Sequence, residues 1–223
     1  WLVGSCPTEP VAIVEHGLKL KVDLSSGQKT GYYLDQRENR LRAAKWSLPG
    51  KMLDVCCYQG GFALAACKFG QPSRVVAVDS SLRALEHAEH NAKENGLEQI
   101  EFVQADCFDY LDHLGAEKAQ FQTVILDPPR MAGHRTQIAA ALRAYHRLNA
   151  SAIRLIAPGG ILVTCSCSGR IKRSDFVGVL ASVAKRSRRR LQIIESLGAD
   201  FDHPVDATCP ESDYLKCLIS RVH

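Results

Sequence analysis

Short apolar runs alternate with amphipathic stretches along the chain from about residue 50 onward. The apolar runs have the length of buried strands, and they cover residues 52–56, 75–79, 100–103, 124–127 and 161–164. Between them, apolar residues recur at three- and four-residue steps, which predicts helices over residues 62–69, 82–95 and 138–156. Gly96 and Pro158-Gly159-Gly160 supply stop signals for the second and third of these helices.

This alternation of strand and helix predicts a parallel sheet with helices on both faces. The last two strand patterns, at residues 191–197 and 214–222, follow one another without an obvious helix between them. They predict an antiparallel edge, because only parallel neighbours require a long crossover connection. The expected fold class is therefore α/β, with a mostly parallel sheet and an antiparallel edge.

The first 46 residues have a different pattern. Their strand-like runs are residues 11–15, 18–22 and 30–34, with turns at His16-Gly17 and Ser25-Ser26-Gly27. A predicted helix over residues 36–46 follows. We therefore expect two units, a small β-rich subdomain with its connecting helix at residues 1–46 and a main domain at residues 47–223.

Composition narrows the class of protein. The 223 residues are 46% hydrophobic, which suffices for one large core and a small appendage. No apolar run approaches the roughly 18 residues that a membrane span needs, so we expect no membrane partner. The chain starts with Trp1 and lacks a signal-peptide pattern, so we expect a cytoplasmic piece of a longer protein.

Cysteine usage and charge add two further limits. Nine cysteines lie mostly in apolar runs, as reduced thiols do, and their spacing predicts no metal site. The net charge of +4 permits a polyanionic partner without requiring one. The basic run at residues 185–190 closes a predicted helix, where a solvated helix end is a simpler explanation than an RNA contact.

Acidic residues stand at the ends of the first three predicted strands of the main domain. The first strand leads through Asp54 to Gly60-Gly61, where the backbone can approach a ligand closely. Asp79 ends the second strand, where a carboxylate can bind ribose hydroxyls. Asp106, after the third, could meet an adenine edge or cap a helix. Because no phosphate-binding motif accompanies them, they predict a nucleoside ligand without phosphates, and S-adenosylmethionine fits that description.

A carboxylate and two thiols follow the next two strands. Asp127 ends one strand, and Cys165 and Cys167 follow the other. Ligands in open α/β sheets lie outside the carboxyl ends of strands, so these side chains are expected to face one pocket. Cys165 and Cys167 would point the same way along a strand, and only the one further past its end should reach the pocket. A thiol beside a carboxylate suits covalent chemistry on a base.

Seven stretches of the chain carry a resemblance that covers nearly its whole length. They are residues 27–37, 58–62, 78–81, 127–129, 166–169, 202–205 and 214–216. On these stretches the chain resembles the class I S-adenosylmethionine-dependent methyltransferases, and within them the bacterial large-subunit (23S) rRNA cytosine-C5 methyltransferase I family. The resemblance implies a Rossmann-like, seven-stranded sheet. It also implies an RNA-binding PUA domain ahead of this region in full-length relatives, which we expect to be missing from this chain.

The resemblance also implies site residues. The expected cofactor contacts are Gln36, Arg37, Asp54, Tyr58, Gly60, Gly61, Phe62, Asp79, Ser80, Asp106, Cys107 and Asp127. The expected substrate contacts are Pro128, Pro129, Tyr145 and His203. Cys167 is the expected nucleophile, because the family's Ser-Cys-Ser falls on it, and Asp127 would stand beside the methyl donor and the target base. Simpler roles stay open for three of them: an ion pair for Arg37, core packing for Tyr145 and a plain turn for His203.

The chain departs from the family pattern at four positions. Gln59 stands where the family usually has Thr, Cys56 where it has an aromatic residue, Arg130 where it has Lys, and Ala144 where it has Gly. These differences leave the implied reaction unchanged. They leave the details of the cofactor loop and of the substrate contacts open.

The thiol agrees with the implied chemistry. Cytosine C5 is a poor nucleophile, and a thiolate that adds to C6 makes it reactive. We therefore predict an S-adenosylmethionine-dependent methyltransferase that makes 5-methylcytosine in large-subunit rRNA through a Cys167 adduct. Alternatives are an rRNA guanine N7 or N2 methyltransferase, which needs no thiol, and a cofactor- and RNA-binding module without turnover. The oligomeric state stays open, with a homodimer as one option.

Overall fold

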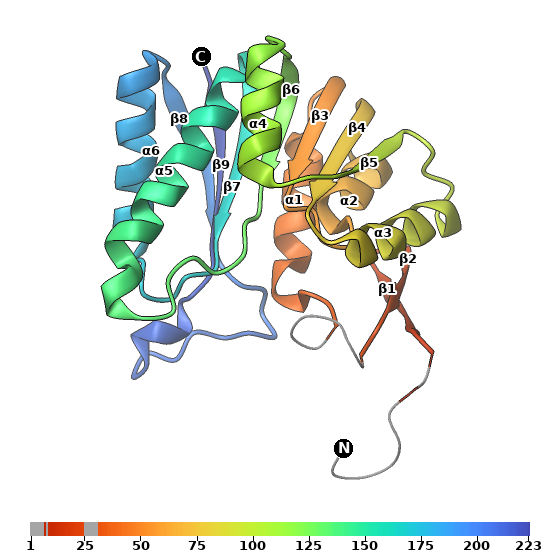
Figure 1. Cartoon of the computed structure of the whole chain (residues 1–223). Helices are drawn as coiled ribbons and strands as arrows, with labels where there is room; N and C mark the ends of the chain where they lie inside the picture. The colour runs from red at the N-terminus through yellow and green to blue at the C-terminus, as the bar shows by residue number, and fades with distance from the viewer. Residues whose placement is uncertain (1–6, 8, 25–30) are drawn as a thin grey trace.

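The computed structural model describes residue 7 and residues 9–24 and 31–223, and its centre is a seven-stranded sheet (Figure 1). The strands lie in the order β5-β4-β3-β6-β7-β9-β8. Their bounds are β3 (Gly50–Val55), β4 (Pro72–Asp79), β5 (Ile100–Gln104), β6 (Phe121–Leu126), β7 (Ile156–Ser166), β8 (Leu191–Leu197) and β9 (Lys216–Val222). The first five pair in parallel, and β9 lies antiparallel between β7 and β8. The predicted α/β class with an antiparallel edge is confirmed.

Helices cover both faces of the sheet, as the alternating pattern predicts. They are α1 (Arg37–Trp46), α2 (Gly61–Phe69), α3 (Leu82–Glu94), α4 (Cys107–Ala116), α5 (Ile138–Arg154) and α6 (Arg173–Ser187). Apolar residues of α4, α5 and α6 share one core cluster with the sheet, and those of α1, α2 and α3 contribute to clusters on the other face (Figure 1). No helix among the described residues is long and apolar enough to cross a membrane.

The N-terminal region packs against the layer formed by α1, α2 and α3. Strands β1 (Val11–Glu15) and β2 (Leu18–Val22) form an antiparallel hairpin, as predicted. The buried side chains of β2 pack with residues of α2 and α3. Arg40 of α1 donates two hydrogen bonds to the carboxylate of Glu15, one of them Nε to Oε1 at 2.7 Å. This buried pair ties the hairpin to the helix; the boundary between residues 46 and 47 stays a prediction.

One predicted element is wrong, and one predicted strand is longer than expected. Residues 31–34 are not a strand: residues 31 and 32 form a bend, and Leu34 starts a short 3-10 turn, Leu34–Gln36; Thr30 lies outside the described residues. Strand β7 starts at Ile156, earlier than predicted, and includes Pro158-Gly159-Gly160. The pairing of β6 with β7 is irregular there, and Gly159 has a φ of 79°. The turn residues therefore bend a strand instead of separating it from the helix.

Parallel pairing decides where the functional groups gather. Because β3, β4, β5, β6 and β7 run in the same direction, their carboxyl ends meet at one edge of the sheet. The loops that follow these strands therefore converge there.

Candidate functional site

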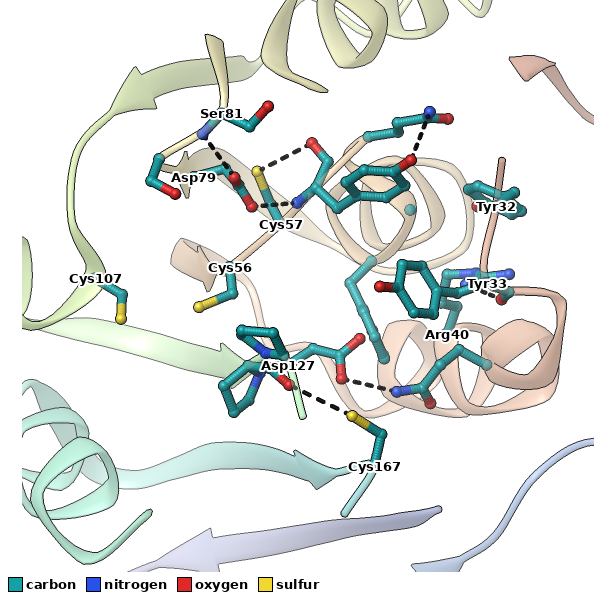
Figure 2. A pocket seen from close by; sticks show the side chains of 18 of the residues that line it. Tyr32, Tyr33, Arg40, Cys56, Cys57, Asp79, Ser81, Cys107, Asp127 and Cys167 are labelled. Atoms are coloured by element: carbon teal, nitrogen blue, oxygen red, sulfur yellow. Dashed lines mark hydrogen bonds between the residues drawn. The ribbon is translucent and has the colours of Figure 1, made fainter. Parts of the chain in front are cut away.

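A cavity of about 350 Å³ opens at the carboxyl ends of the parallel strands (Figure 2). We divide it into an acidic half and a thiol half. The acidic half follows β3, β4 and β5 and is lined by Asp79 and Asp106, with Asp54 buried behind it; the thiol half follows β6 and β7 and is lined by Asp127 and Cys167. Figure 2 shows Asp79 and Ser81 on one side of the view and Asp127 with Cys167 on the other. The volume lies in the range of small-molecule sites.

The loop between β3 and α2 lies directly on the acidic half. Its backbone turns sharply, with positive φ angles at Cys56 (61°), Tyr58 (50°) and Gly60 (76°). A side chain at Gly61 would come within 2.8 Å of the Tyr32 hydroxyl, so only glycine fits there. The first turn of α2 therefore faces the cavity at close range. The N–H groups at the start of a helix have no intrahelical acceptor and favour an anionic ligand group.

Asp79 and Asp106 both accept hydrogen bonds from backbone N–H groups of the loops around the acidic half. Asp79 accepts hydrogen bonds from Tyr58 N (2.8 Å) and Ser81 N (2.9 Å) and lines the cavity. Asp106 lines it too and also caps α4, because its Oδ1 accepts from Phe108 N (2.8 Å) and Asp109 N (3.2 Å). The two interpretations of Asp106 are therefore compatible.

Asp54 is placed differently. It is fully buried, does not line the cavity, and accepts a hydrogen bond from Ala63 N at 2.9 Å. Burial, with the nearby Asp127 carboxylate, raises the pKa of Asp54 to about 8. A mostly neutral Asp54 at pH 7 anchors α2 behind the site, so its predicted cofactor contact is indirect in this structure.

Asp127 connects the two halves. Its backbone N–H donates to Val55 O of β3, and its Oδ1 accepts a hydrogen bond from Gln36 Nε2 at 2.8 Å. Asn39 Nδ2 in turn donates to Gln36 Oε1, which fixes the orientation of the Gln36 amide. Gln36, Asp127, Pro128 and Pro129 all line the cavity, as predicted.

Cys167 is half-buried and lines two cavities. Its Sγ lies 3.9 Å from the carbonyl oxygen of Pro128 (Figure 2). It also lines a second cavity of about 560 Å³, together with Arg130, Arg170 and His203. Cys165 is fully buried, opposite Cys217 in the pairing of β7 with β9. Of the two thiols, Cys167 is the one that lines the cavities.

Tyr145, an expected substrate contact, does not line either cavity at Cys167. It is fully buried and packs edge-on against Phe176, with ring centroids 5.2 Å apart. Its hydroxyl lies 3.2 Å from Ser168 Oγ. Ser168 Oγ also accepts hydrogen bonds from the backbone N–H groups of Met131 and Ala132. Tyr145 therefore supports the loop that carries Cys167.

Arg37, an expected cofactor contact, lies outside the first cavity. It pairs with Asp200 and Asp202. The ion pair, which the sequence left open as its alternative, is what the fold contains. His203 lines the second cavity and hydrogen-bonds Asp202 at 2.8 Å between Nδ1 and Oδ1.

Most of the other predicted contacts lie on the first cavity. Tyr58, Gly61, Phe62, Ser80 and Cys107 all line it, whereas Gly60 only shapes the turn. The sequence analysis missed Arg40, which also lines it. Arg40 follows the Gln36-Arg37 pair by one helical turn, and this i, i+4 spacing from Gln36 was the available signal.

Comparisons with known proteins agree with this geometry. A family model described as S-adenosylmethionine-dependent methyltransferase matches residues 1–219. The chain belongs to this family. A relative from Aeromonas hydrophila subsp. hydrophila, called ribosomal RNA large subunit methyltransferase I, is 43% identical over 223 residues, covering 99% of this chain and 56% of the relative. One of the same name from Photobacterium profundum is 43% identical over 217 residues, covering 96% and 54%. The chain thus spans about half the length of these relatives.

Solved structures show the same fold. A SAM-dependent methyltransferase from Streptococcus mutans superposes with a TM-score of 0.85 at 22% identity, over 98% of this chain and 57% of the other. Trm5b from Pyrococcus abyssi gives a TM-score of 0.72 at 17% identity, over 99% and 57%. These likenesses bear on architecture, and the predicted Rossmann-like methyltransferase fold is confirmed.

The cavity fits the family's cofactor. Two buried polar atoms on its wall, the Tyr32 hydroxyl and Gln59 Oε1, have no hydrogen-bond partner among the described residues. One is a donor and the other an acceptor, so together they suit the carboxylate and the ammonium of an amino-acid moiety. Asp79 offers a carboxylate for a ribose diol, at the end of the neighbouring strand.

Proposed function

We propose that this chain is the methyltransferase part of an enzyme that makes 5-methylcytosine in large-subunit rRNA through a covalent adduct on Cys167. The observation that carries the proposal is the position of Cys167, whose side chain lines both the cofactor cavity and the second cavity. A nucleophile that forms a bond with the base must line the cavity that receives the substrate. It must also lie next to the cavity that holds the methyl donor.

The acidic half would hold the cofactor. Tyr32, Gln59 and the first turn of α2 would take its amino-acid end, and Asp79 its ribose. Asp106 has a second carboxylate oxygen beside the one that caps α4, and this oxygen would take the adenine amine. When bound, S-adenosylmethionine supplies an electrophilic methyl group on a sulfonium.

The thiol half would activate the base. The thiolate of Cys167 bonds C6 of cytosine, and the electron pair of the C5–C6 double bond becomes available at C5 to accept the methyl group. Loss of the C5 proton to a base then restores the double bond and breaks the bond between Sγ and C6. The thiol is returned unchanged at the end of the cycle.

Asp127 would read the edge of the cytosine. Its carboxyl group faces the first cavity beside Cys167, and Gln36 fixes one of its oxygens. A carboxyl group at N3 and the exocyclic amine can share a proton with the ring as electron density rises there. This role also discriminates cytosine from uracil, which presents the opposite donor and acceptor pattern on that edge.

The second cavity would receive the flipped nucleotide. Its cationic groups Arg130 and Arg170 suit phosphates, and Tyr33 and Tyr214 supply aromatic surface for stacking. A base must leave its stack to reach an enclosed thiol. Large-subunit rRNA is proposed as the substrate because the relatives at 43% identity carry that name.

Covalent trapping tests the proposal. RNA with 5-fluorocytosine at the target position should form a stable adduct with the protein and cofactor, because fluorine cannot leave as a proton does. Cys167→Ala should give no adduct and lower methylation by more than about a thousandfold, as loss of a covalent nucleophile does.

Cys165→Ala is the matched control and should keep most of the activity. If competent RNA is methylated without an adduct, methylation of a guanine nitrogen replaces this proposal. If the protein binds the cofactor and the RNA without any turnover, the chain is a binding module.

A further inference from the structure

Lys216, the first residue of β9, places a buried amine at the base of the thiol half. Its side chain is only 1% exposed. Nζ donates hydrogen bonds to the carbonyl oxygens of Ser168 and Tyr214, both at 2.8 Å. In the strand pairing, Lys216 lies opposite Ser166. The amine of Lys216 therefore contacts the loop that carries Cys167. The contact is at Ser168, the residue directly after the cysteine.

No described carboxylate lies within ion-pair distance of this amine, although buried lysines are usually paired. Burial lowers the pKa of Lys216 to about 8. The side chain is thus still mostly an ammonium at pH 7. The fold therefore holds a cation at a site where burial disfavours its charged form.

The charges around Lys216 come from several elements. Asp213, ahead of β9, and Asp175, on α6, favour its charged form, and Arg173 opposes it. Asp213 is itself paired with Arg173 at 3.5 Å. Cys167 also favours the charged form of Lys216, which is the interaction between an ammonium and a thiolate. Such an interaction is reciprocal: the ammonium favours the thiolate by the same free energy.

The tyrosines and the carboxylate that face Cys167 among the described residues oppose a thiolate or are neutral. The hydroxyls of Tyr33, Tyr145 and Tyr214 interact with Cys167, and ionisation of each is disfavoured. Asp127 lines the same cavity, where its negative charge disfavours a second one. Arg130, Arg170 and His203 line the outer cavity, which is open to solvent screening. Arg40 also lines the first cavity and is paired with Glu15. Among the described residues, Lys216 is a buried cation whose amine contacts the residue next to Cys167.

We propose that Lys216 is a positioning residue that prepares Cys167 for attack: its ammonium holds the Ser168 carbonyl and stabilises the thiolate form of the neighbouring cysteine. The inference rests on the proposed role of Cys167 as the nucleophile. A thiolate, and not a thiol, is the reactive species, so this cation sets how much of the enzyme is ready at neutral pH.

Alkylation of Cys167 across pH tests the charge effect without RNA. Iodoacetamide labelling of the whole chain is followed by tandem mass spectrometry, which separates Cys167 from Cys165. In Lys216→Gln, which keeps a hydrogen-bond donor and removes the charge, the midpoint of labelling should rise by about one pH unit. Labelling at pH 7 should then slow about tenfold.

Two controls accompany this measurement. The exposed Cys209 serves as an internal reference and should label at the same rate in both chains. Lys185→Gln makes the same change at an exposed lysine and should leave the Cys167 profile unchanged. An identical Cys167 profile in a folded Lys216→Gln chain would overturn the inference, because a purely structural lysine changes stability and not this midpoint.

A reciprocal measurement decides the matter if Lys216→Gln does not fold. The Nζ resonance of Lys216 can be titrated in the protein labelled with 15N-lysine, since the protons of a buried ammonium exchange slowly with water. Its midpoint should lie lower in Cys167→Ser than in the wild type, because the thiolate that favours the ammonium is gone. Equal midpoints contradict the proposal.

The two proposals fail separately. If the labelling midpoint shifts but 5-fluorocytosine RNA gives no adduct, Lys216 tunes a thiol that has another role. If the adduct forms and the midpoint does not move, Cys167 is the nucleophile and Lys216 is not what prepares it.

Discussion

The two halves of the cavity are held together in different ways. In the acidic half, carboxylates mostly bind backbone N–H groups a few residues away, as Asp79 does with Ser81 and Asp106 with Phe108. In the thiol half, Ser168 binds the backbone of Met131 and Ala132, and Lys216 binds Ser168 from β9. The acidic half is thus built largely from local contacts, and the thiol half from contacts between segments far apart in the sequence.

Each half also has a buried group whose pKa is shifted to about 8, an acid in one half and an amine in the other. Burial raises the pKa of Asp54 to about 8 and lowers the pKa of Lys216 to about 8. Asp54 gains charge above this pH and Lys216 loses charge above it. At neutral pH the acidic half therefore contains a neutral buried acid, whereas the thiol half contains a buried cation.

The largest expected effect concerns the buried acid. Its folded pKa of about 8 lies above the unfolded value of about 4, so the native state binds the extra proton between these pH values. The stability that Asp54 contributes is complete below about pH 4. It falls by about 1.4 kcal/mol per pH unit as the pH rises from about 4 to about 8. Asp54→Asn cannot ionise and should remove this slope.

Urea denaturation at pH 5 and pH 8 measures the slope. The free energy of unfolding of Asp54→Asn, relative to the wild type, should rise by roughly 4 kcal/mol over this interval. Asp109→Asn changes an exposed acid and should show no such trend. Parallel curves for Asp54→Asn and the wild type would mean that Asp54 is charged in the native state.

A smaller effect is expected in the thiol half from Ser168→Ala. The change leaves the buried N–H groups of Met131 and Ala132 without their acceptor, which costs about 3 kcal/mol. Methyl transfer should fall by about a hundredfold, because the loop of Cys167 is no longer held, while cofactor affinity changes less than about threefold.

Ser220→Ala is the matched control for that measurement. Ser220 is also fully buried, but its Oγ has no hydrogen-bond partner among the described residues. Its removal should change the free energy of unfolding by less than about 1 kcal/mol. A loss of cofactor affinity in Ser168→Ala equal to its loss of activity would show that the two halves are not independent.

In the acidic half, Asp79→Ala should act on binding. It removes a charged acceptor for the ribose and releases Tyr58 N and Ser81 N. S-adenosylmethionine should bind about thirtyfold more weakly by calorimetry, which corresponds to about 2 kcal/mol. The rate at which iodoacetamide labels Cys167 should stay as in the wild type. A large change in this rate would show that the acidic half and the thiol half are not independent.

The smallest effect is expected for Arg37, which the sequence assigned to the cofactor. Arg37→Ala breaks the ion pairs with Asp200 and Asp202 outside the cavity. We expect a loss of about 1 kcal/mol of stability and less than about a threefold change in cofactor affinity. An effect on affinity as large as that of Asp79→Ala would return Arg37 to the binding site.

Sequence patterns located the strand ends because the physics there is local. Apolar periodicity placed most strands and helices within a few residues, and parallel pairing brings their carboxyl ends to one edge. Asp79, Asp106, Asp127 and Cys167 could therefore be named in advance. The strand expected at residues 30–34 failed in its described part because nothing in a short apolar run excludes a turn.

The sequence by itself determined the layered α/β fold and which side chains end the strands, since both follow from periodicity and chain direction. Tertiary structure alone decided that the Tyr145 hydroxyl contacts Ser168 and that Arg37 pairs with Asp200. It also decided that Lys216 is buried under the loop of Cys167. These outcomes depend on which distant segments pack together, and a side chain's partner across the fold leaves no periodic signal in its own neighbourhood.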